Sequence, residues 1–148
     1  MHKCSCFSKF TIHYSPLPPL LCAMSLTVKQ RYILLVFYFI TMCVLFTLPG
    51  SAFPKAGWLG KVGFDKWVHI GLFGLFTFLI CWALRIKGRK RFLWTFLAAT
   101  VYGILVELVQ DQFIKNRSFD LGDWGADIIG SFIGIWFWNR RYIKNRPL

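Results

Sequence analysis

The chain has 148 residues, of which 56% are hydrophobic and 16% charged, and its formal net charge is +12 at pH 7. This length corresponds to one domain, and a charged fraction well below the roughly 25% of soluble domains argues against an ordinary water-soluble protein. The basic residues lie in short clusters between long apolar runs, as they do in membrane proteins. Because the aromatic residues lie inside those apolar runs, we expect no nucleic-acid partner.

The N-terminal segment, residues 1–23, differs from the rest of the chain. Three prolines interrupt its apolar patch, so it does not resemble the core of a signal peptide. Met24 is followed by a sequence typical of the start of a membrane span. We therefore expect residues 1–23 to be disordered or to precede the natural start, and residues 24–148 to form one membrane domain. The five cysteines predict neither a disulfide framework nor a zinc site.

Four long apolar runs follow and predict an all-α fold. Each is close to the ~20 residues that a helix needs to cross the hydrocarbon core of a bilayer. None has the regular polar face that a helix of a soluble bundle shows. We therefore expect a polytopic membrane protein with a four-transmembrane-helix bundle. The predicted spans are residues 32–48, 67–84, 92–109 and 121–138.

The basic residues are distributed unequally about these spans. One side has Lys29, Arg31, Arg85, Lys87, Arg89, Lys90, Arg91, Arg140, Arg141, Lys144 and Arg146, whereas the other has Lys55, Lys61, Lys66, Lys115 and Arg117. The positive-inside rule places the more basic side, and with it both termini, in the cytoplasm.

All six acidic residues lie between positions 65 and 127, and in this topology they share the outer side of the membrane. They occur near three predicted helix ends, as Asp65, Glu107, Asp111, Asp120, Asp123 and Asp127. Asp127 follows Leu121 by six residues, which is about 9 Å along a helix and below the lipid headgroups. An ionisable group at such depth faces the bundle interior or a water-filled cavity. We therefore expect these carboxylates to meet in one outer pocket.

Small residues recur at every fourth position of the last span, as Gly122, Ala126, Gly130 and Gly134. This spacing lets helix backbones approach closely in lipid. We expect the strip to pack against neighbouring helices and to hold the acidic face of the last span beside the second and third.

Several of these residues together form a recognisable pattern. Asp65-Lys-x-x-His69, Glu107-x-x-Gln110 and Arg117 followed by Asp123, Asp127, Gly130 and Gly134 resemble the VanZ-like family of small bacterial membrane proteins. The resemblance covers roughly Lys61–Trp138, with Asp127 at a position where the family often has Asn. It implies a place in the bacterial inner membrane, a cell-envelope role and a link to low-level teicoplanin resistance. It implies no particular reaction.

The first functional hypothesis is a site for an envelope ligand. Carboxylates with one histidine suit Mg²⁺, Ca²⁺ or Mn²⁺, so a divalent cation is a candidate cofactor. Its candidate ligands are Glu107, Asp123 and Asp127, and the wider ligand-binding set comprises Asp65, Lys66, Gln110, Arg117, Asp123 and Asp127. The ligand would be a lipid-linked phosphate or a peptidoglycan precursor. Glu107 or His69 is a candidate catalytic base.

The second hypothesis is a non-catalytic membrane scaffold or binding protein. In a scaffold, the acidic residues would form a structural polar network between helices, in which each pair contributes about 0.6 kcal/mol. Four short helices without an inverted repeat argue against a transporter. Enzymatic turnover and the oligomeric state are left open at this point.

Overall fold

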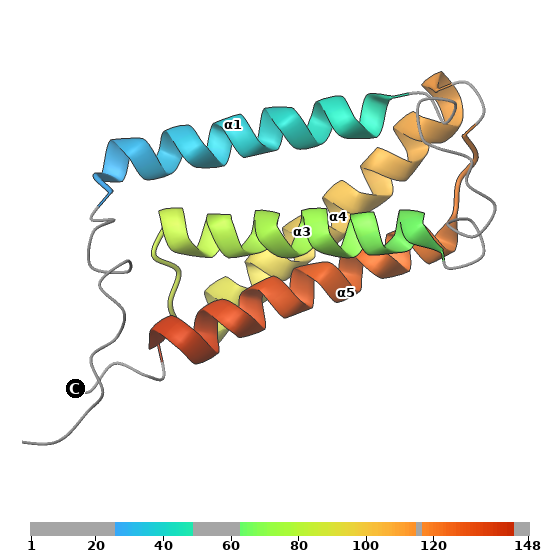
Figure 1. Ribbon diagram of the computed structural model, residues 1–148. Helices are drawn as coiled ribbons and strands as arrows, with labels where there is room; N and C mark the ends of the chain where they lie inside the picture. The colour runs from blue at the N-terminus through green and yellow to red at the C-terminus, as the bar shows by residue number, and fades with distance from the viewer. Residues whose placement is uncertain (1–25, 49–62, 115–116, 144–148) are drawn as a thin grey trace, which may run out of the picture.

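The structure, a computed structural model, describes residues 26–48, 63–114 and 117–143. The only regular secondary structure of these residues is helical, which confirms the all-α prediction for this part of the chain. The helices are α1 (Val28–Thr47), α3 (Phe64–Ala83), α4 (Arg89–Phe113), α5 (Leu121–Trp138) and the short π-helix η3 (Asn139–Ile143), shown in Figure 1. The expectation for residues 1–23 lies outside the described residues.

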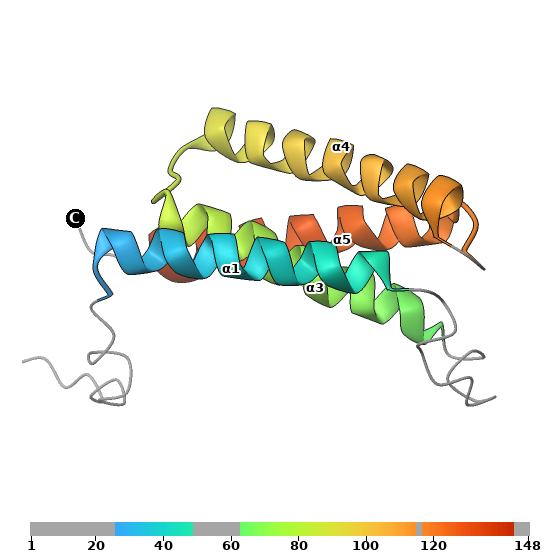
Figure 2. The ribbon, with the colours of Figure 1, turned by 90° about the horizontal axis from the view of Figure 1, so that it is seen from above.

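The four long helices correspond to the four predicted spans and alternate in direction along the bundle (Figures 1 and 2). As a result, α1 and α4 end where α3 and α5 begin. We call this the acidic end of the bundle, because the acidic residues lie on the helix turns and the connection that meet there. The opposite end carries the basic connection between α3 and α4.

Three helices, α1, α3 and α4, are long and apolar enough to cross a membrane. Their surfaces expose large apolar side chains, among them Phe37 at 68% and Trp94 at 63%, which a bilayer would cover. The 18-residue α5 is not in this group, because Asp123, Asp127 and four glycines lower its mean hydropathy. These three helices indicate a membrane protein. That α5 forms a fourth span stays a prediction.

Local residues determine where the helices begin. Thr27 and Gln30 form a capping box at the start of α1. Asp120 caps α5 by accepting a hydrogen bond from the Gly122 amide. Gly63 precedes α3 with a φ of 62°, a left-handed conformation that favours glycine. These starts place Asp65 and Asp123 in the first turns of α3 and α5, where the helix dipole stabilises negative charge.

The backbones of α3 and α5 touch through small residues. A Cβ atom added at Gly134 would meet the Gly74 carbonyl oxygen, and one added at Gly130 would meet the Ile70 carbonyl oxygen. Ala126 of the same strip is buried. This close approach brings the acidic first turns of α5 beside the first turns of α3.

Candidate functional site

His69 occupies the centre of the acidic end. Its side chain is 1% exposed, and its Nδ1 atom lies 2.8 Å from Asp127 Oδ1 and 4.0 Å from Glu107 Oε1. These three residues come from α3, α5 and α4, and we call them the inner group. All three are buried, so three helices together exclude water from one histidine and two carboxylates.

Two carboxylate oxygens of the inner group, Glu107 Oε1 and Asp127 Oδ2, have no hydrogen-bond partner among the described residues. The second oxygen of Glu107 accepts the Asp120 amide at 3.2 Å. Asp127 Oδ2 lies against Gly103 of α4, where an added Cβ atom would be only 2.8 Å away. Because a buried carboxylate oxygen without a partner is costly, a proton or a cation would stabilise each of these oxygens.

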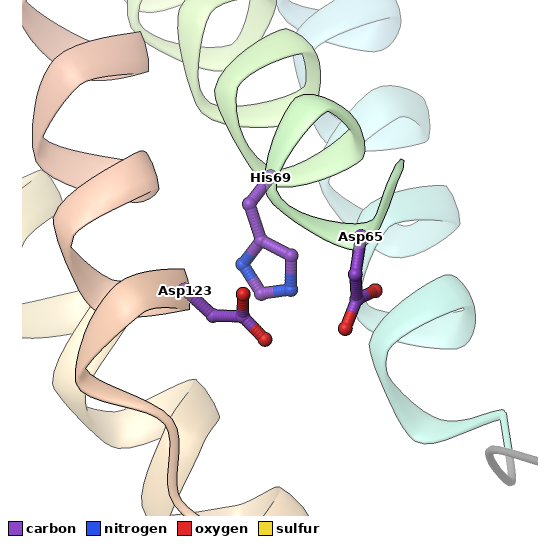
Figure 3. A group of neighbouring side chains, drawn as sticks. All are labelled: Asp65, His69 and Asp123. Carbon is purple, nitrogen blue, oxygen red and sulfur yellow. The ribbon is translucent and has the colours of Figure 1, made fainter. Parts of the chain in front are cut away.

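A second group of possible metal ligands includes the same imidazole and lies closer to the surface of the bundle. Asp65, His69 and Asp123 each place one ligand atom within 4.8 Å of the others, and we call them the outer group. In Figure 3 the carboxylates of Asp65 and Asp123 lie beside the ring, one from α3 and one from α5. With Nδ1 facing Asp127, Nε2 is the nitrogen left for the outer group. A carboxylate on one ring nitrogen commonly orients the other towards a metal.

Two basic residues border the outer group. Lys66 Nζ lies 2.8 Å from Asp120 Oδ2 and 3.0 Å from Asp123 Oδ1. Arg117 Nη1 lies 3.7 Å from Asp65 Oδ2. The Lys66 ammonium, together with the Gly122 amide, holds the pKa of the Asp120 carboxyl below its usual range. The acidic end therefore has buried carboxyl groups inside and cations at its rim.

The structure divides the predicted site residues between two locations. Glu107 and Asp127 lie in the inner group, whereas Asp123, the third predicted metal ligand, lies in the outer group. The residue that the two groups share is His69. Gln110 has a different environment, because it is 2% exposed and its Nε2 atom donates to the Phe46 carbonyl at 3.0 Å. That hydrogen bond joins α4 to the end of α1.

Sequence reasoning missed two neighbours of the site. The Phe46 ring packs against the His69 ring with a centroid distance of 4.9 Å. Phe46 lies in a uniformly apolar run, so no pattern distinguished it. Gly103 provides the surface that faces Asp127. It precedes Glu107 by four residues, hence shares its helix face, and this spacing could have identified it.

Comparison of the chain with protein-family models, curated proteins and solved structures found no match in any of the three. The resemblance to the VanZ-like family thus depends on the motif residues alone and stays a prediction.

Proposed function

We propose that this chain is an integral membrane protein that binds a divalent cation at His69 and, through it, the phosphate of an envelope ligand. The observation that carries the proposal is a pair of buried carboxylate oxygens beside His69, on Glu107 and Asp127, to which no described residue donates a hydrogen bond. Oxygen donors with one imidazole suit Mg²⁺ or Mn²⁺, and a cation would bind these carboxyl groups in their ionised form.

The same observation favours a ligand site over a purely structural network. Buried polar networks that stabilise a fold normally satisfy each of their polar atoms, because a partly satisfied network is unfavourable. The ion pairs of Lys66 reach Asp120 and Asp123 but do not extend to the inner group. The inner carboxylates therefore lie in a place where a bound ion would complete their coordination.

Lys66 and Arg117 support the phosphate part of the proposal. They border the outer group and pair there with Asp120 and Asp65, whose side chains are 50% and 53% exposed. An exposed ion pair such as Lys66–Asp120 contributes only about 0–1 kcal/mol, so an incoming anion can replace Asp120 while Lys66 keeps its contact with Asp123. Arginine in particular binds phosphate through two parallel hydrogen bonds.

The predicted topology and the VanZ-like resemblance place this ligand in the bacterial cell envelope. All four helices would span the inner membrane, with both termini in the cytoplasm and the acidic end at the outer leaflet. A lipid-linked phosphate or a peptidoglycan precursor is the corresponding ligand class. Changed susceptibility to teicoplanin is the corresponding phenotype.

Cation binding is tested with Mn²⁺ and the purified protein in nanodiscs, by electron paramagnetic resonance. We expect Glu107→Gln and Asp127→Asn to weaken Mn²⁺ binding at least about tenfold, as the loss of a metal-site carboxylate does. The matched control is Asp111→Asn, which removes an exposed carboxylate from the next turn of α4 and should leave binding unchanged.

Normal yield and normal Mn²⁺ affinity in Glu107→Gln and Asp127→Asn would exclude the cation site. Loss of folded protein in both variants, with no Mn²⁺ binding by the unmodified chain, would support the scaffold alternative. Release of inorganic phosphate from an added lipid phosphate would assign turnover to this chain.

A further inference from the structure

An apolar cavity of about 220 Å³ lies between α1 and α4. Its walls include Phe46 and Thr47 of α1, and Leu105, Val106, Val109 and Gln110 of α4; we call it the α1–α4 groove. Leu105 and Val109 are 53% and 43% exposed, so the groove borders the apolar surface that the bilayer covers. The volume exceeds the roughly 150 Å³ of an apolar cavity that binds benzene.

The shape of the groove selects a chain-like occupant. On α4 its walls extend from Tyr102 to Gln110, a distance of about 12 Å at 1.5 Å per residue. Because α4 is a helix of membrane-spanning length, this direction follows the axis along which lipid chains lie. A helix of a partner protein, about 10 Å in diameter, is too wide for a space of this volume. A single hydrocarbon chain suits both this volume and this direction.

The groove ends beside the inner group. Phe46 lines it and also packs against the His69 ring at a centroid distance of 4.9 Å. Val106 lines it and directly precedes Glu107. Gln110 and Thr47 are polar residues at its end nearest the acidic end of the bundle. A chain in the groove would therefore have its head at the acidic end of the bundle, next to Phe46 and Gln110.

We infer that the α1–α4 groove holds one hydrocarbon chain of a membrane lipid whose phosphate headgroup binds at the His69 site. This inference rests on the proposed function and identifies the ligand class as a lipid phosphate. The groove provides apolar contact for the chain, while the cation and the basic residues Lys66 and Arg117 hold the headgroup.

The test measures binding of dilauroylphosphatidic acid to the full chain in a neutral detergent with Mg²⁺, by native mass spectrometry. Leu105→Trp fills the groove and should weaken binding at least about tenfold, since several methylene contacts are lost. Val109→Trp provides a second obstruction, should the first variant fold poorly. The matched control is Leu108→Trp, which changes a 42% exposed leucine of α4 that does not line the groove. Its binding should equal that of the unmodified chain.

Two further measurements link the groove to the site. Dilauroylglycerol, which has the same chains without phosphate, should bind at least about tenfold more weakly than the phosphatidic acid. Mn²⁺ binding should be unchanged in Leu105→Trp, because the cation ligands are intact. These measurements can therefore contradict the lipid groove without contradicting the cation site, and the reverse.

Several results would overturn the inference. Unchanged lipid binding in both folded groove variants would show that the chain lies elsewhere, although normal Mn²⁺ binding would leave the proposed function intact. Equal losses in Leu105→Trp and Leu108→Trp would indicate ordinary boundary lipid. Equal affinity for dilauroylglycerol, or for inorganic phosphate alone, would show that chain and headgroup are not recognised together.

Discussion

Lys66 pairs with two aspartates that differ in their surroundings. The side chain of Asp123 is 7% exposed, whereas that of Asp120 is 50% exposed. An exposed ion pair contributes about 0–1 kcal/mol, but a buried acceptor that loses its partner costs about 1–3 kcal/mol. The contact with Asp123 is therefore the one that stabilises the fold.

Replacing Lys66 should reveal this difference. We expect Lys66→Gln to lower the free energy of unfolding by about 1–3 kcal/mol, because Asp123 loses its charged partner. Asp120→Asn should cost less than about 1 kcal/mol, since asparagine caps a helix as well as aspartate does. Unfolding in mixed detergent micelles measures both values. Adding Asp123→Asn to Lys66→Gln should restore part of the loss, and equal effects of the two single variants would contradict this account.

The carboxylate oxygens of the inner group differ in their hydrogen bonding. Nδ1 of His69 and Oδ1 of Asp127 form a hydrogen bond at 2.8 Å, while Glu107 Oε1 and Asp127 Oδ2 receive no hydrogen bond from the described part of the chain. The imidazole therefore cannot serve all the acids around it. This imbalance is the observation on which the proposed cation site rests.

At the scale of elements, α5 combines an acidic start with a glycine-containing face. Gly130 and Gly134 lie against the α3 backbone, whereas a Cβ atom at Gly125 would have no neighbour within 4 Å. Glycine lowers helix stability wherever it occurs. It is therefore useful at Gly130 and Gly134, where the two backbones touch, and unnecessary for packing at Gly125.

Alanine substitutions along α5 should consequently have opposite signs. Gly134→Ala should destabilise the fold by at least about 1–3 kcal/mol, because the added methyl group overlaps the Gly74 carbonyl and separates α3 from α5. Gly125→Ala should stabilise it by about 0.5–1 kcal/mol through helix propensity alone. The midpoint of thermal unfolding in detergent measures both. A Gly134→Ala protein as stable as the unmodified chain would contradict the observed packing.

On the scale of the whole molecule, alternating helix direction separates the charges. The acids gather where α3 and α5 begin, while Arg85, Lys87, Arg89, Lys90 and Arg91 lie at or beside the connection at the opposite end. From this separation the positive-inside rule predicts an orientation in which the acidic end faces outward.

Cysteine labelling tests this orientation. In a chain whose native cysteines are replaced by alanine, Asp111→Cys should react with an impermeant maleimide added outside intact spheroplasts. Lys87→Cys should react only in inverted vesicles, because it lies at the basic end of the bundle. Both positions are exposed, so burial would not prevent their labelling. Labelling of both cysteines from one side would exclude the proposed topology.

Much of the helical framework is determined by the sequence itself. Apolar runs of span length predict helices, and the four predicted spans correspond to α1, α3, α4 and α5. The helix α4 continues to Phe113, beyond the third apolar run that ends at residue 109, because Gln110 and Asp111 lower the local hydropathy without ending the helix. Because successive spans reverse direction, the order of the runs also predicts that three helix ends carry their acids to one level.

Only the tertiary structure decided which of these residues meet. Helical spacing assigns a side chain to a face of its own helix, but a uniformly apolar run carries no signal for how that helix is rotated against its neighbours. Close packing of Gly130 on Ile70 sets the rotation between α3 and α5, and it brings His69 to Asp127. The contact of Phe46 with His69 and the groove beside it depend on the same packing, because they join helices that are distant in the sequence.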